Sequence, residues 1–143
     1  MNAVDTNVLI YSADSDEQEK GPVAVALLNR LATDPTSTVL PWQVLCEFTA
    51  FIAKARLRNP ATAAQVESSA FEYVRAIRDR FRLVLPSPAA SDLAIDIHLR
   101  DQVSIWDAML LAACVEAGVT QLFTEDMQSR PTIRGVRIVN PFM

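Results

Sequence analysis

The sequence comprises 143 residues, a length typical of one domain with a single substantial core. The composition, with 50% hydrophobic and 21% charged residues, excludes a disordered chain. The formal net charge of −4 argues against a protein whose whole surface carries positive charge for nucleic acid.

Short apolar runs, two of which end at a proline, predict the strands. The first run leads directly into Asp5, and the apolar residues at 8–11 favour an adjoining helix turn. The predicted strands span residues 2–4, 37–41, 82–86, 119–124 and 135–140.

Between the strands lie segments that have apolar residues at helical spacing and typical helix ends. Pro22 stands in the first turn of one, and Asn59 and Pro60 open another as a cap and a first-position proline. Ser104 caps the last of them, which stops at Gly118. The predicted helices span residues 21–33, 42–56, 59–81, 87–103 and 104–118.

Strands separated by helices are typical of a parallel sheet that is covered by helices on both faces. We therefore predict a single α/β domain over residues 1–143, with four or five parallel strands. In such sheets the ligand site lies beyond the carboxyl ends of the strands.

The remaining composition favours a cytoplasmic protein without a membrane partner. No basic segment followed by a long apolar run opens the chain, and the apolar stretch at 108–115 is far shorter than the ~20 residues that span a bilayer. Cys46 and Cys114 fit no metal-ligand spacing, so we expect buried free thiols, with a disulfide left open.

The charges are unevenly distributed along the chain. Residues 1–50 hold two basic and seven acidic residues, whereas residues 51–82 hold seven basic and three acidic ones. Arg75, Arg78 and Arg82 would share one helical face at spacings of three and four. A solvated helix face is the simpler interpretation, and a track for an RNA backbone is the alternative.

Four acidic residues come from four separate segments and all fall near a strand's carboxyl end or a helix N-terminus. Asp5 directly follows the first strand, and Glu47 lies in the first turns of the helix after the second. Asp107 lies in the first turn of the last helix, and Asp126 comes two residues after Thr124. Carboxylates that meet at one edge repel each other unless a cation lies between them, and oxygen ligands suit Mg²⁺ or Mn²⁺.

Each of these acidic residues also has a purely structural interpretation. Asp5 can cap a turn, and Asp126 lies in a turn of ordinary composition. Ser104 and Asp107 match a capping box, in which the acid reaches back to the backbone N–H of the cap. The convergence of four such positions on one edge favours the functional interpretation.

The motifs that carry these acids resemble the four signatures of the PIN-domain family, and among them those of the VapC-type toxin ribonucleases. They are "VDTNVLIY" at 4–11, the single Glu47, "SIWDAMLLAACVEAG" at 104–118 and "LFTEDM" at 122–127. The motifs occur in the family's order and cover essentially the whole chain.

The resemblance implies a three-layer α/β/α sandwich and a metal-dependent endoribonuclease, the toxin of a type II toxin–antitoxin system. The family's acidic positions map onto Asp5, Glu47, Asp107 and Asp126, and the hydroxyl positions beside them onto Thr6 and Thr124. We expect Asp5 and Asp107 to be the main direct ligands of Mg²⁺ or Mn²⁺, with Glu47 and Asp126 ligating directly or through water. Without metal, like-charge repulsion should raise the pKa of at least one carboxyl group.

The resemblance also implies a cognate antitoxin protein and a homodimer, in addition to the RNA substrate. The segments 42–56 and 60–81 carry more apolar and aromatic residues than one helix face needs. They are the predicted dimer surface.

Two other classes of function compete with this interpretation. A haloacid-dehalogenase-type phosphatase also has an aspartate after its first strand. Such an enzyme needs a second aspartate at the position of Asn7, and it needs a lysine late in the chain, whereas Lys20 and Lys54 both precede the third strand. A PIN-fold RNA-binding or partner-binding protein without a toxin role is the alternative, and the complete acidic set argues against it. His98, the sole histidine, is expected as a half-exposed helix residue away from the acids.

Overall fold

A six-stranded sheet forms the centre of this computed structural model, which describes residues 1–58 and 63–143. The spatial order of the strands is β3-β2-β1-β4-β6-β5, and all neighbours are parallel except the β5–β6 pair. The strands are β1 (Asn2–Val4), β2 (Thr38–Pro41), β3 (Arg82–Val84), β4 (Gln121–Phe123), β5 (Thr132–Ile133) and β6 (Val136–Val139). The predicted α/β fold with a parallel sheet is confirmed.

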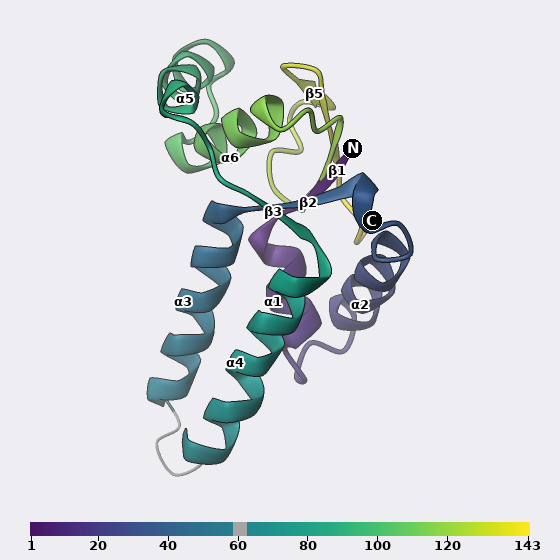
Figure 1. Cartoon of the computed structure of the whole chain (residues 1–143). Coiled ribbons are helices and arrows are strands. Elements are labelled where there is room, and N and C mark those ends of the chain that lie inside the picture. The colour runs from purple at the N-terminus through teal and green to yellow at the C-terminus, as the bar shows by residue number, and fades with distance from the viewer. Residues whose placement is uncertain (59–62) are drawn as a thin grey trace.

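Helices cover both faces of the sheet, as Figure 1 shows: α5 and α6 lie on one side of the strands and α1 to α4 on the other. The helices are α1 (Thr6–Ala13), α2 (Lys20–Leu31), the short 3₁₀ helix η1 (Pro35–Ser37), α3 (Trp42–Arg58), α4 (Ala63–Arg80), α5 (Pro88–Asp101) and α6 (Ile105–Glu116). None of the helices in the described ranges combines the length and the apolar character that a membrane crossing requires. The predicted cap Asn59 and first-position Pro60 lie outside the described residues.

The direction of the chain across the sheet reverses between β1 and β4. From β1 the chain moves outward through β2 to β3, then returns to pair β4 with the other side of β1. Ala3 accordingly pairs with Val39 on one side and with Leu122 on the other. The carboxyl ends of β1 and β4 thus flank the crevice where open α/β sheets bind ligands.

The central strand is buried on both faces, as expected for a parallel sheet. Ala3 and Val4 have no exposed surface, and Leu9 of α1 and Leu111 of α6 are equally buried. Phe48 of α3 is the largest of the fully buried side chains and meets the Tyr73 ring of α4 edge-on, with ring centroids 6.1 Å apart. This core fixes the end of β1, from which the chain enters α1.

Two expectations from the sequence are wrong. Helix α4 ends at Arg80 and Arg82 opens β3, so Arg82 does not share a helical face with Arg75 and Arg78. Cys46 is exposed because it lies on the outward side of α3, whereas Cys114 is buried; both are free thiols.

The antiparallel edge strand β5 was not predicted, because two residues are too short to show a periodic pattern. Arg134 and Gly135, with φ of 50° and 84°, form the tight turn between β5 and β6. The Arg134 guanidinium also donates to Asp101 at 2.7 Å and Asp96 at 2.9 Å, which ties the hairpin to α5. The sheet therefore has one strand more than predicted, and this strand lies far from β1.

The buried position of Phe48 gives a test of the core. We expect Phe48→Ala to lower the free energy of unfolding by about 3–5 kcal/mol, because it removes a ring that has no exposed surface. Leu99→Ala is the matched control; its side chain is 71% exposed, so the change should stay within ~0.5 kcal/mol. Urea unfolding measures both, and equal losses would contradict this description of the core.

Candidate active site

The Asp5 carboxylate lies at the carboxyl end of β1, and the residue is only 7% exposed. It caps α1, because its Oδ1 accepts the backbone N–H of Thr6 at 2.6 Å. Its Oδ2 accepts the hydroxyl of Thr124, which follows β4, at 2.7 Å. Asp5 is therefore a helix cap, as one interpretation of the sequence predicted. It is also a buried carboxylate at the end of β1, where the direction of the chain across the sheet reverses.

Asn7 connects Asp5 to Asp126 through its side-chain amide. Its Nδ2 lies 3.3 Å from Asp5 Oδ2, 3.2 Å from Thr124 Oγ1 and 3.2 Å from Asp126 Oδ2. Thr124 Oγ1 also accepts the backbone N–H of Asp126 at 3.0 Å. The exposed Asp126 side chain is thereby held beside the buried Asp5.

Glu47 joins the same cluster from α3. The Thr6 hydroxyl donates to its Oε2 at 2.7 Å, and Gln43, one helical turn earlier, donates to its Oε1 at 2.8 Å. The same Gln43 amide donates to the backbone carbonyl of Trp106 in α6 at 3.1 Å. Glu47 is exposed, and its two partners fix it between α1 and the N-terminus of α6.

Asp107 is the least connected of the four predicted acids. Its Oδ2 accepts the hydroxyl of Ser104 at 2.8 Å, and the same hydroxyl accepts the Asp107 backbone N–H at 3.1 Å. The carboxylate thus bonds to the side chain of the cap rather than to its backbone N–H. Among the described residues, the only hydrogen-bonded link from Asp107 toward another acid is indirect: Gln43 donates both to the carbonyl of Trp106, the neighbour of Asp107, and to Glu47.

Burial is the main cause that raises the pKa of Asp5 from its ordinary value of 3.8 to about 6. Hydrogen bonds from Thr124 and Thr6 lower this pKa, and the negative charges of Asp126 and Glu47 raise it further. Like-charge repulsion therefore contributes, as predicted, but it is secondary to burial. Burial also raises the pKa of Cys114 in α6 to about 12, and the Asp5 charge adds to this shift.

Glu125, the neighbour of Asp126, belongs to a different cluster. Its carboxylate accepts from Lys20 Nζ at 2.6 Å and from the Tyr11 hydroxyl. Burial alone would raise the pKa of Glu125, but these two hydrogen bonds outweigh it and lower the pKa. This acid is already paired with a cation and is not part of the Asp5 cluster.

The residues missed by the sequence analysis are Asn7, which bridges Asp5 and Asp126, and Gln43, which connects Glu47 to the Trp106 carbonyl. Gln43 could have been found, because it precedes Glu47 by four residues on a helix, the spacing of facing side chains. His98 is exposed near the end of α5, where its Nδ1 lies 2.7 Å from the Val103 carbonyl oxygen, away from the acids.

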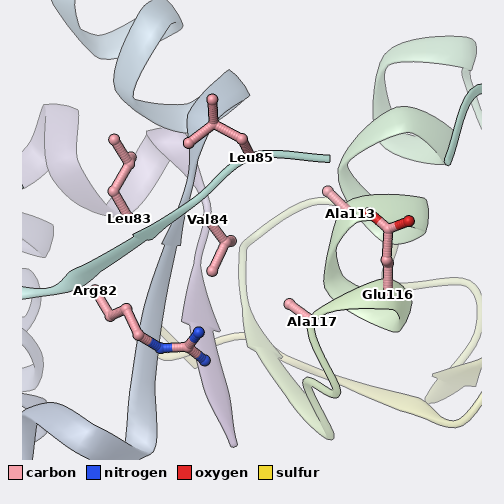
Figure 2. Close-up of a pocket in the computed structure, with 7 residues that line it drawn as sticks. All are labelled: Arg82, Leu83, Val84, Leu85, Ala113, Glu116 and Ala117. Carbon is pink, nitrogen blue, oxygen red and sulfur yellow. The ribbon is translucent and has the colours of Figure 1, made fainter. Parts of the chain in front are cut away.

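In residues 1–58 and 63–143, no three His, Cys, Asp or Glu side chains lie close enough to hold one ion in their present positions. The carboxylates are instead spaced by the bridging donors described above. A separate pocket of about 310 Å³ lies between β3 and α6 (Figure 2); it is lined by Arg82 and Glu116 together with apolar residues, and it contains none of the four acids.

The fold and the site define an α/β domain with acidic side chains gathered at the carboxyl ends of its central strands. A family model described as the PIN domain matches residues 3–130. The chain therefore belongs to the PIN domain family, a family of nucleases.

Solved structures with the same fold include toxin–antitoxin proteins. VapBC2 from Rickettsia felis, bound to a DNA fragment from its promoter, matches with a TM-score of 0.69, 14% identity and 97% of each chain covered. FitAcB from Neisseria gonorrhoeae matches with a TM-score of 0.69, 17% identity and 99% of each chain covered. The sarcin–ricin loop cleaving toxin VapC20 from Mycobacterium tuberculosis matches with a TM-score of 0.63, 20% identity, and 96% of this chain and 99% of that chain covered. The comparison with curated protein sequences gives no match.

The raised pKa of Asp5 predicts a pH-dependent stability. Between pH 3.8 and about 6, the Asp5 carboxyl keeps its proton in the folded protein but loses it in the unfolded chain. The protonated carboxyl therefore contributes fully to the free energy of unfolding below pH 3.8, and this contribution is lost as the pH rises to about 6 and above. In chelator, Asp5→Asn should therefore be more stable than wild type at neutral pH, by up to about 3 kcal/mol, and nearly equal to it below pH 3.8. Urea unfolding across this range measures the difference, and parallel pH profiles would contradict the assignment.

Proposed function

We propose that this PIN domain is a Mg²⁺- or Mn²⁺-dependent endoribonuclease and the toxin of a type II toxin–antitoxin pair. The observation that carries the proposal is the Asp5 carboxylate, which is 7% exposed, lies where the strand order reverses, and has the charges of Asp126 and Glu47 beside it. A buried carboxylate among like charges is stabilised by a cation that lies between them.

The chemistry of the donor set fits a hard divalent cation. Every proposed ligand is a carboxylate oxygen, and Mg²⁺ and Mn²⁺ prefer such ligands. Asp5 and Asp107 would be the main direct ligands, and Glu47 and Asp126 would ligate directly or through water. A bound ion would neutralise the charges of these carboxylates and would supply a water molecule of lowered pKa for the hydrolysis of a phosphodiester.

The bridging residues of the chain hold these carboxylates in place. Thr6 and Thr124 each occupy one oxygen of Asp5, which fixes the plane of its carboxylate. Asn7 holds Asp126 beside Asp5, and Gln43 holds Glu47 against the N-terminus of α6. These contacts orient the acids before any substrate arrives, which reduces the reorganisation that the reaction needs.

The solved structures of the same fold support the choice of substrate and partner. One of them is named as a toxin that cleaves the sarcin–ricin loop, and another, from Klebsiella pneumoniae, as a toxin–antitoxin complex. We infer a cognate antitoxin protein for this chain by analogy with them. Exposed basic side chains such as Lys54 would attract the RNA backbone, so binding should weaken with salt.

A homodimer is part of the same proposal. Its surface cannot use the main apolar residues of α3 and α4, because Phe48, Ile52, Val74 and Ile77 are buried within the chain. Other residues of these helices would have to form the contact.

The proposal is tested by incubating structured and single-stranded RNA with wild type, Asp5→Ala and Asp107→Asn, with Mg²⁺, Mn²⁺ or chelator. We expect cleavage by wild type with either ion, and a loss of at least roughly 100-fold in both variants and in chelator, because each removes a ligand or the ion itself. Glu125→Gln is the matched control, since it also removes one negative charge but from the Lys20 cluster, and it should cleave as wild type does.

Cleavage that persists in chelator, or at the wild-type rate in either ligand variant, would contradict a metal-dependent nuclease. RNA binding without cleavage by the wild type under every condition would favour the PIN-fold binding protein instead.

A further inference from the structure

An apolar groove of about 290 Å³ lies beside the acidic cluster, where the N-terminal turns of α3 and α6 meet the start of α5. Its lining includes Trp42, Trp106 and Met109, together with Ser87 and Ser91, and none of its lining residues is charged. The two tryptophans are 46% and 65% exposed, and they are the only tryptophans of the chain. Large apolar side chains left exposed in one place mark a binding surface.

The groove is continuous with the acidic cluster through Gln43. This residue lines the groove, and its amide donates to Glu47 at 2.8 Å and to the Trp106 carbonyl at 3.1 Å. Trp106 is also the immediate neighbour of Asp107. A ligand whose phosphate lies at the acids would therefore place its next group in the groove.

The size and chemistry of the groove select its occupant. A volume of 290 Å³ lies at the lower limit of ligand pockets, which hold about 300–1,000 Å³, so the groove takes one small ring system rather than a helix of a partner. The neutral, indole-bearing lining suits an uncharged aromatic ring, and such platforms bind the bases of single-stranded nucleic acid by stacking.

We propose that the Trp42–Trp106 groove binds one unpaired nucleobase of the RNA strand, next to the phosphodiester held at the acidic cluster. This inference rests on the proposed function, and it adds a requirement for an unpaired base beside the cleaved bond. Trp106, the more exposed of the two, would carry most of the stacking surface, and Trp42 is the second aromatic residue of the lining.

The test uses intrinsic fluorescence, because both tryptophans of the chain line this one groove. A short single-stranded RNA pool of mixed sequence is titrated into the full-length Asp5→Asn variant, which does not need to cleave. We expect quenching that saturates with RNA, and none with an abasic backbone of the same length and charge. Quenching by the abasic strand as well, or by neither strand, would overturn the proposal.

Affinity is then measured with labelled RNA in the same background. Trp106→Ala should weaken binding roughly tenfold and Trp106→Phe should retain most of it, because phenylalanine still offers a ring for stacking. Leu99→Ala, which removes another exposed apolar side chain from outside the groove, should bind as its parent does. Equal affinity of Trp106→Ala and its parent would overturn the proposal.

These outcomes separate the groove from the nuclease. Metal-dependent cleavage by wild type without base-dependent quenching would support the nuclease proposal and refute base binding in the groove. Base-dependent quenching without cleavage by wild type would support base binding in the groove and refute the nuclease proposal. Fluorescence that changes with protein concentration in the absence of RNA would show that a second copy covers the groove, and would also overturn the proposal.

Discussion

The site depends on one interaction: the buried Asp5 carboxylate accepts hydrogen bonds from the Thr6 backbone N–H and the Thr124 hydroxyl. The first contact starts α1 at the end of β1, and the second ties that end to the end of β4. A carboxylate that is 7% exposed needs such donors, because an unsatisfied charge in this position would be very unfavourable. Even with them, its pKa rises to about 6, and a cation beside the carboxylate would favour its charged form.

The parallel sheet explains why the other acids come to the same place. The strands β1, β2 and β4 are parallel neighbours, so the segments that follow them all begin at the same edge of the sheet. The Asn7 amide then bridges Asp5 and Asp126, and the Gln43 amide holds Glu47 beside the N-terminus of α6. Gln43 also lines the groove with the two tryptophans and donates to the Trp106 carbonyl of α6, so one residue contacts both the acidic cluster and the proposed base-binding groove.

Much of the fold could be predicted from the sequence, because apolar runs, prolines and helix caps such as Ser104 determine where strands and helices begin and end through local interactions. Asp5 caps α1 and also lies beside Asp126 and Glu47, so its role as a helix cap does not exclude the proposed role in the site. The sequence could not show the strand β5, because two residues are too short for a periodic pattern, and it could not show which side of α3 Cys46 faces. The spacing of the acids by bridging side chains is likewise a product of packing.

The central claim is that the cluster around Asp5 binds a divalent cation, and calorimetric titration with Mn²⁺ tests it most directly. We expect wild type and Glu125→Gln to bind the ion alike, because Glu125 is paired with Lys20 rather than with the cluster. Asp5→Asn should lose this binding, since it removes the charge at the centre of the site. Absence of binding to wild type, or unchanged binding to Asp5→Asn, would contradict the account.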